Sequence, residues 1–495
     1  MERGEQNRLS RFDNIPRKGR RSYMLHLESM VEKLKATFYN SVDFVAREIS
    51  FPKDQYAILC YYSSMANKKD VQDILSVLKV QTTFNEKDWD ATTATQKESY
   101  DLEKLVEYVC QGYTVLLLLN SQQMVRFTMP NLPHRSPDEP INEAIIRGAH
   151  EGFVEDTDVN LGLIRKRMRV PDLIVKKVTV GIDNKADIYY MYLARYANQD
   201  NLADLERKLE GIKDQADGLY TSGQLNDFIE DNPISPFPQI MNTERPDRVF
   251  ANLTEGKIVI MTDYSPTAFI TPVTLFSFYQ SPDDFNSRVI VGSFYRMVRI
   301  VSFLTAVYLP ALYIAIVSYH YEVLPIELSK KLKLDISEIP FKPIVEALIV
   351  EIIIELIREA SVRLPKSLVQ TIGIVGGLVV GDVIISAGLV SNMVVIVVAL
   401  TAISSYVVPS VELNTSVRVL RFPFMFAAAF FGFFGIMAGF LILTIHLCNL
   451  SSLKSPYFSP IVPFEPNKIP QMFFRQKHSR SGPQPSSFDP KGKKT

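Results

Sequence analysis

Hydrophobic and polar residues are distributed differently in the two halves of this 495-residue chain. Up to about residue 286, apolar positions form short runs separated by charged, Gly-containing and Pro-containing stretches, which is typical of a soluble protein. From about residue 287 to 450, long apolar runs dominate, and several are long enough to cross a bilayer as helices. The pattern predicts an α/β soluble N-terminal half followed by an α-helical polytopic membrane domain.

The soluble half is predicted to form two α/β subdomains, over residues 25–135 and 136–286. In the first, short apolar strand patterns at 56–63 and 114–121 alternate with helical patterns. In the second, the strand patterns LIVKKVTVG, DIYYMYLA and GKIVIMTDY flank a charged helical pattern, LADLERKLEGI. A Pro-rich segment, 129–140, separates the two. Because alternating strands and helices indicate compact α/β units, we expect the soluble half to fold without detergent.

Both ends of the chain are polar. Residues 1–24 are basic and lack an apolar core, so they are predicted to be a disordered arm rather than a secretory signal. Residues 451–495 are Pro-rich and end in basic residues, which predicts a disordered tail. Arg288, Arg296 and Arg299 flank the first apolar run on its N-terminal side, and basic residues favour the cytoplasmic side. The soluble half is therefore predicted to be cytoplasmic.

Four apolar windows are predicted to span the membrane, at about 297–319, 372–390, 393–408 and 422–446. Only two residues separate the middle two windows, which predicts a tight helical hairpin. Between the first and second windows, residues 343–360 form an apolar helix with three acids, four apart, on one face: Glu351, Glu355 and Glu359. Such a helix can be partly inserted and amphipathic, or can line an aqueous cavity. Four or five crossings are compatible with the pattern, and this choice sets the side of the C-terminus.

The window IGIVGGLVVGDVIISAGLV (372–390) carries an acid in the middle of an apolar run. An ionisable group at membrane depth is costly and usually faces a bundle interior or a water-filled path. The spacing predicts small helix-packing positions at Gly373, Gly377 and Gly381. It also predicts one pore-lining helix face made of Val375, Val379, Asp382 and Ser386. The alternative is a packing helix in which Asp382 bonds to a neighbouring helix.

Charge and motifs argue against other classes of protein. The chain has 54 basic and 54 acidic residues, so nothing in its net charge points to nucleic acid. Its six histidines form no HExxH motif, and no GxSxG, P-loop or GxGxxG motif is present. Its three cysteines, Cys60, Cys110 and Cys448, are too far apart in sequence for a metal motif. We therefore predict no enzymatic activity, no cofactor and no metal site.

Several long segments, in order, carry a resemblance to a known family. They read HEGFVEDTDVNLGLIRKRMR (150–169), SPFPQIMNTERPDRV (235–249), TPVTLFSFYQSPDDF (271–285) and EALIVEIIIELIREASVRLPKSLVQTIGIVGGLVVGDVIISAGLVSNMVVIVVALTAISSYVVPS (346–410). The chain resembles the A subunits of the GerA-type spore germination receptors of endospore-forming bacteria. The likeness runs from about residue 145 to 423 and is weaker before that. His150 stands where the family more often has Arg, so no charge role is assigned there.

The resemblance implies a membrane subunit of a nutrient receptor in the spore inner membrane, with its soluble domain on the cytoplasmic, spore-core side. Such receptors include a transporter-like B subunit and a lipoprotein C subunit, and they release ions when a small nutrient triggers germination. The A subunit is expected to homo-oligomerise in the lipid bilayer into a ligand-gated channel that releases cations. The alternative is a non-conducting scaffold that assembles the other subunits. A secondary transporter is less favoured, because no repeat of two related halves is visible.

Overall fold

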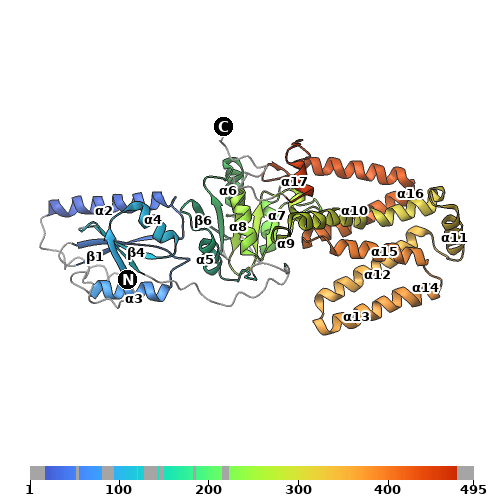
Figure 1. Cartoon of the computed structure of the whole chain (residues 1–495), viewed down its shortest axis with the longest axis horizontal. Helices are drawn as coiled ribbons and strands as arrows, with labels where there is room; N and C mark the ends of the chain where they lie inside the picture. Colours follow the sequence, from blue (N-terminus) through green and yellow to red (C-terminus); the bar gives the residue numbers. More distant parts are fainter. Residues whose placement is uncertain are drawn as a thin grey trace.

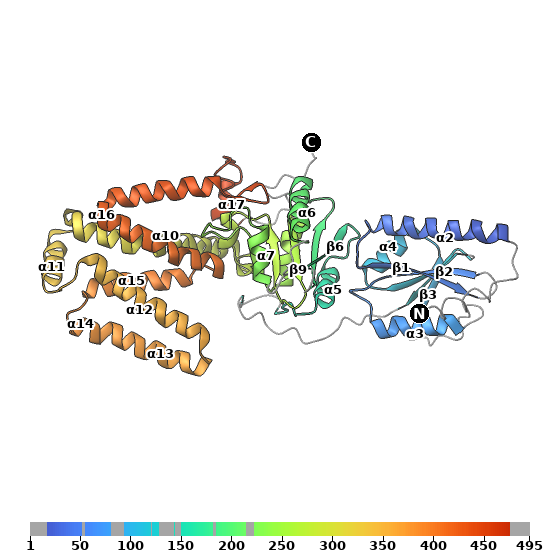
Figure 2. The same cartoon turned by 180° about the vertical axis from the view of Figure 1, so that it is seen from behind.

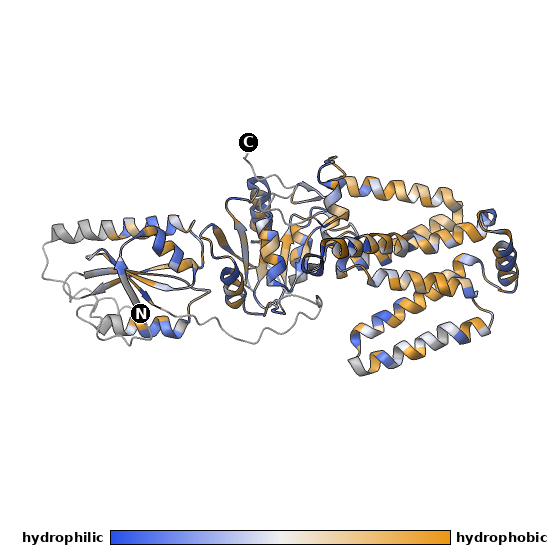
Figure 3. Ribbon diagram, in the orientation of Figure 1, coloured by the Kyte–Doolittle hydropathy of each residue, from blue (hydrophilic) through white to orange (hydrophobic). Residues whose placement is uncertain are grey.

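A computed structural model describes residues 17–51, 55–80, 94–119, 121–127, 143, 150–181, 185–213 and 222–475. Two subdomains, each with one sheet, and a bundle of long helices follow one another along the longest axis of the molecule (Figure 1). Apolar residues are concentrated on the helices of the bundle (Figure 3). The predicted fold class, an α/β soluble half followed by a helical membrane domain, is confirmed.

The first subdomain is a five-stranded antiparallel sheet with the strand order β1-β2-β4-β5-β3. Alternating side chains of β2 point to opposite faces. Ile58 and Cys60 pack with α2 and α4, whereas Ala57 and Leu59 pack with α3. Its elements are α2 (Arg17–Thr37), β1 (Phe44–Phe51), β2 (Gln55–Tyr62), α3 (Lys68–Val80), β3 (Ala94–Ser99), α4 (Leu102–Cys110), β4 (Thr114–Leu118) and β5 (Gln123–Phe127).

The second subdomain repeats this topology. Its antiparallel sheet has the order β6-β7-β9-β10-β8. In both sheets, two hairpins lie side by side, and the strand that is third along the chain, β3 or β8, forms the edge next to the second hairpin. The elements are α5 (Thr157–Arg167), β6 (Leu173–Val180), β7 (Ala186–Leu193), α6 (Gln199–Lys213), α7 (Ser222–Ile229), β8 (Met241–Thr243), α8 (Pro246–Thr254), β9 (Ile258–Thr262), β10 (Ala268–Thr271) and η2 (Leu275–Tyr279).

Two predicted boundaries in the soluble half can be compared with the structure only in part. Helix α2 already begins at Arg17, so the predicted arm of residues 1–24 ends earlier than expected, and residues 1–16 lie outside the described part. The predicted Pro-rich boundary at 129–140 also lies outside the described residues. Within the described residues, the strands predicted at 56–63 and 114–121 correspond to β2 and β4.

Three of the described helical stretches are long and apolar enough to cross a membrane: Val289–Tyr319, Leu368–Ser386 and Val411–Asn449. The predicted span at 393–408 is a 15-residue helix, shorter than a bilayer requires. The helices are α9 (Pro282–Asn286), α10 (Val289–Tyr319), η3 (Tyr321–Val323), α11 (Ile326–Ser337), α12 (Pro343–Arg363), α13 (Lys366–Leu378), the π-helical turn η4 (Val379–Val383), α14 (Ile384–Ser386), α15 (Asn392–Tyr406) and α16 (Val411–Asn449).

Helix α16 is a hairpin rather than the single span predicted at 422–446. The chain reverses at Gly432, whose φ of 57° and ψ of −137° are not helical. A Cβ on Gly439, in the second leg, would lie 2.7 Å from the Phe424 ring of the first leg, so the two legs are antiparallel neighbours. Both legs begin or end beside the second subdomain, where Ser416 donates to the Pro236 carbonyl and His446 Nε2 lies 2.8 Å from Ser235 Oγ.

The predicted tight hairpin between 372–390 and 393–408 is also corrected. Helix α13 packs on α12, and α12 lies between α13 and α15 in both views (Figure 1, Figure 2). Helix α12 runs from the end of the bundle remote from the soluble half, where Glu346 accepts from the Ser391 amide, toward its near end, where Arg358 contacts Ser405. Its 21 residues rise about 31 Å, which matches a bilayer core, so α12 runs the length of the bundle.

The predicted disordered tail, 451–495, is ordered as far as Arg475, and residues 476–495 lie outside the described part. This ordered segment, Ser451–Arg475, is called the strap. It forms β11 (Ser451–Ser452), β12 (Ser455–Pro456) and α17 (Ile469–Phe473). Leu453, which is 1% exposed, and the fully buried Tyr457 enter the two cores of the second subdomain. The strap thus lies on the same side of the helical bundle as the soluble half.

Candidate functional site in the membrane helices

The helix that carries the predicted pore residues lies at the edge of the bundle. Across Leu368–Ser386, none of the described side chains is buried within the protomer. A Cβ on any of the three glycines predicted as packing positions would meet nothing within 4 Å: Gly373, Gly377 and Gly381. Val375 is 56% exposed, and Asp382 is exposed as well. The small-residue stripe therefore faces away from the protomer, where a second chain can reach it.

A π-helical turn alters the predicted face. Five residues, Val379–Val383, form this turn, which holds more residues than an α-helical turn. Residues beyond it are rotated by about a quarter of a turn from the positions that regular α-helical spacing gives. Ser386 is exposed and donates its hydroxyl to the Asp382 carbonyl at 2.6 Å. The side chain of Val379 lies outside the described part. Val375, Asp382 and Ser386 are all exposed in the protomer, and the turn rotates Asp382 and Ser386 together relative to Val375.

Sequence spacing missed the glycine at which α13 packs within its own chain. A Cβ on Gly376 would lie 2.6 Å from Cδ1 of Ile357 in α12. Gly376 therefore sets the close approach of α12 and α13, whereas its neighbour Gly377 faces open space. The two adjacent glycines in IVGGLV thus have different surroundings in the protomer, and the sequence pattern gives no signal that separates them.

Two of the three acids predicted on α12 are partners of arginines on the first leg of α16. Glu351 accepts from Arg421, and both side chains are fully buried. Glu355 accepts from Arg418 at 3.0 Å and is about one-quarter exposed. Glu359 pairs with Arg363 of its own helix at 2.6 Å, and both side chains are largely exposed. The acidic face of α12 is therefore covered by protein around Glu351 and exposed around Glu359, at the end nearer the soluble half. This differs from an amphipathic helix that lies on the membrane surface.

One hydrophobic core joins the second subdomain to the ends of the membrane helices. Phe237 and Leu275 of the subdomain share this core with Leu413 and Leu447, which belong to the two legs of α16. A second joint lies at the base of α10, where the buried Asp284 accepts from Arg296 at 3.2 Å and from Arg299 at 2.7 Å. The second subdomain is thereby joined to both α10 and α16.

Comparison with known proteins identifies the family. A model of the family described as Bacillus/Clostridium GerA spore germination protein matches residues 32–487. The chain belongs to this GerA family. It is 37% identical over 443 residues to spore germination protein GerIA of Bacillus cereus, which covers 87% of this chain and 64% of that protein. It is 38% identical over 405 residues to spore germination protein A1 of Bacillus subtilis, which covers 81% of this chain and 83% of that protein.

A solved structure is also similar. The crystal structure of the N-terminal domain of the A subunit of the Bacillus megaterium spore germinant receptor GerK3 aligns with a TM-score of 0.37 and 24% sequence identity. The alignment covers 49% of this chain and 92% of the GerK3 domain.

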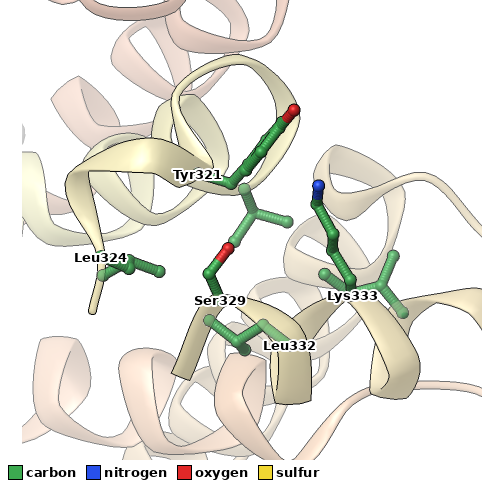
Figure 4. A pocket seen from close by; sticks show the side chains of 7 residues that line it. Tyr321, Leu324, Ser329, Leu332 and Lys333 are labelled. Carbon is green, nitrogen blue, oxygen red and sulfur yellow. The ribbon is translucent and has the colours of Figure 1, made fainter. Parts of the chain in front are cut away.

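One small cavity in this GerA-family chain lies between α10, η3 and α11, at the end of the bundle remote from the soluble half (Figure 4). Its volume of about 20 Å³ holds one water molecule and excludes a nutrient. The Lys333 ammonium lies 3.3 Å from the centre of the Tyr321 ring beside it. The cavity is lined by Val317, Tyr321, Leu324, Ser329, Leu332, Lys333 and Ile336.

The soluble half offers no reactive thiol among its described residues. Burial raises the pKa of the Cys60 thiol to about 12, and burial also raises the pKa of Cys110 to about 11. Because the thiolate is the reactive form, both cysteines are poor nucleophiles and poor metal ligands near neutral pH. No group of three or more His, Cys, Asp or Glu residues with metal-binding geometry occurs in the described part of the chain.

Leucine substitutions at Gly376 and Gly377 are expected to have different effects, one on the stability of the protomer and the other on oligomerisation. Gly376→Leu should force α13 away from Ile357 and destabilise the protomer by about 1–3 kcal/mol, because the new side chain overpacks a close helix contact. Gly377→Leu should leave the protomer intact and lower the yield of crosslinked oligomer, because a large side chain on the outer stripe separates neighbouring helices. Thermal unfolding and crosslinking in lipid nanodiscs measure the two effects. Identical behaviour of both variants would contradict this assignment.

Proposed function

We propose that this GerA-family protein is the membrane subunit of a nutrient receptor that triggers spore germination, and that its copies oligomerise into a ligand-gated channel that releases cations. The observation that carries the proposal is the uncovered helical stretch Leu368–Ser386. It is apolar and long enough to cross a bilayer, it exposes an acid, and it leaves its glycine stripe open. A second copy of the chain would cover the stripe and surround a path bearing a ring of Asp382 carboxylates.

The proposed receptor works in the spore inner membrane, with the soluble half in the cytoplasm, on the spore-core side. The strap and the soluble half lie at the same end of the helical bundle, which supports an even number of crossings. The proposed partners are a transporter-like B subunit and a lipoprotein C subunit, with the B subunit as the nutrient binder. In this arrangement the core shared by Phe237, Leu413 and Leu447 couples the soluble half to the channel.

Potassium release from spores tests conduction. Val375→Ala should release potassium without nutrient roughly tenfold faster than the wild type, since losing two methyl groups from an apolar constriction weakens closure by about 1–2 kcal/mol. Asp382→Asn should reduce nutrient-triggered release, because a neutral ring no longer attracts cations. Both effects are compared at equal protein abundance in the spore membrane.

The adjacent residue Ile374 provides the control for the constriction. Ile374→Val also shortens an exposed apolar side chain, 71% exposed in the protomer, but on a different part of the helix surface, and it should leave release unchanged. Normal release in all three variants at normal abundance would remove this helix from the conduction path. That result would favour the alternative function, a non-conducting scaffold that assembles the receptor complex.

A further inference from the structure

A row of charged side chains follows α12 into the interior of the helical bundle. Its near end is exposed, since the Glu359 side chain is 66% exposed. One turn further in, Glu355 is 25% exposed, and two turns further in, Glu351 is fully buried. Eight residues of helix place Glu351 about 12 Å deeper than Glu359. The row is therefore a graded polar path from the soluble-half end of the bundle to the Glu351–Arg421 pair.

The innermost pair leaves most of its hydrogen-bonding capacity unused. Arg421 donates through Nη1 to Glu351 Oε2, but its Nε and Nη2 have no hydrogen-bond partner in the described part of the chain. Glu351 Oε1 has no partner there either. In the next layer, Glu355 Oε1, Arg358 Nη1 and Arg418 Nε are buried without a hydrogen bond in the described part of the chain, although Glu355 Oε1 and Arg358 Nη1 lie 3.7 Å apart as an ion pair. Unpartnered donors and acceptors therefore lie together around one buried ion pair.

The mixture of donors and acceptors defines the chemistry of the ligand. An anion would satisfy only the arginine atoms, and a cation would satisfy only the carboxylate atoms. Water both donates and accepts, and buried waters commonly bind polar groups that lack a protein partner. Polar groups left without a partner at membrane depth are strongly destabilising, so a ligand that bonds to these atoms would stabilise the arrangement.

We propose that the Glu351–Arg421 pair and the surrounding atoms of Glu355, Arg358 and Arg418 form a binding site for ordered water inside each protomer. The site fills from the exposed Glu359 end of α12. It is separate from the outward-facing side of α13 and needs no second chain. The contact between α12 and the first leg of α16 is thus a hydrated polar interface within an otherwise apolar bundle.

A structure of the full chain in lipid, at a resolution that shows water, tests the site directly. We expect solvent density within hydrogen-bonding distance of Arg421 Nε or Nη2 and of Glu351 Oε1. A rearranged pair, in which these atoms bond to each other and leave no space for solvent, would overturn the proposal. An anomalous signal at the site in crystals soaked with bromide would identify an anion and would also overturn it.

Hydrogen–deuterium exchange in nanodiscs provides a second test. Glu351→Met alone leaves Arg421 buried without its ion-pair partner and is expected to lower protein yield. The test therefore combines Glu351→Met with Arg421→Met, which removes both charges at similar side-chain volume. Peptides covering residues 348–358 should exchange roughly tenfold more slowly in this double variant, because water no longer reaches α12. The control, Glu359→Gln with Arg363→Gln, alters only the exposed pair and should exchange like the wild type. Equal exchange in the double variant and the wild type would contradict a hydrated interior.

Discussion

Replacing Gly432 with leucine is expected to abolish accumulation of the protein in membranes. The backbone at Gly432 has φ of 57° and ψ of −137°, a region that only glycine adopts readily. A Cβ there would also lie 3.0 Å from His320 Nε2 and 3.3 Å from the Tyr319 ring. Backbone strain costs about 1–3 kcal/mol, and overpacking adds a similar amount, so the two legs of α16 should fail to close.

Immunoblotting of membrane fractions and thermal unfolding in nanodiscs measure this effect. Gly373→Leu is the matched control, because a Cβ on Gly373 meets nothing within 4 Å and the helical backbone there accepts any L-residue. We expect wild-type protomer stability from the control and almost no recoverable protein from Gly432→Leu. Equal amounts of both variants would show that α16 crosses the bundle without the reversal.

Replacing Arg165 with methionine should detach the first subdomain from the second. Arg165 belongs to α5, is 2% exposed and donates to both carboxylate oxygens of Asp43, at 2.8 and 2.9 Å. Its guanidinium lies 4.0 Å from the centre of the Tyr62 ring, and Nη2 donates to Ser41 at 3.0 Å. The substitution leaves the Asp43 carboxylate buried and unpaired, which costs about 3–5 kcal/mol.

Limited proteolysis and thermal unfolding of the full chain report this separation. Arg167→Met, two residues along the same helix, removes an ion pair with Glu151 whose side chains are 25% and 38% exposed. Surface pairs of this kind contribute at most about 1 kcal/mol, so this control should stay close to the wild type. Adding Asp43→Leu to Arg165→Met should recover part of the loss, since no charge then remains buried. Similar stability of both single variants would exclude an ion-pair lock between the subdomains.

The sequence predicted the elements of this fold better than their arrangement. Apolar periodicity located strands such as β2 and β4 because each pattern lies within a few consecutive residues. It could not give the shared strand order of the two sheets, which depends on contacts between distant strands. It also missed the reversal at Gly432, because a hydropathy window counts apolar residues and is insensitive to one left-handed backbone position.

For the candidate site, the sequence likewise indicated individual residues but not their partners in the fold. Spacing identified the glycine stripe and Asp382, and both are exposed on the protomer. Spacing also placed Glu351 and Glu355 on one face, but their partners Arg421 and Arg418 are more than 60 residues away, so the ion pairs appear only in three dimensions. The strap was missed because Leu453 and Tyr457 lie in a segment rich in Ser and Pro, where the apolar residues follow neither a helical nor a strand period.

The strap is translated after every membrane helix, yet it contributes to both cores of the second subdomain. The strands of the second sheet leave the ribosome before any membrane helix, yet Leu453 and Tyr457, which complete the cores on both sides of that sheet, are translated after the last one. A nascent chain therefore carries an incomplete soluble domain throughout insertion of its helices into the bilayer. Chains that stop before the strap are left with exposed apolar surface, the feature that chaperones and proteases use to select defective proteins. The two cores of the second subdomain can therefore be completed only after the membrane helices have been translated.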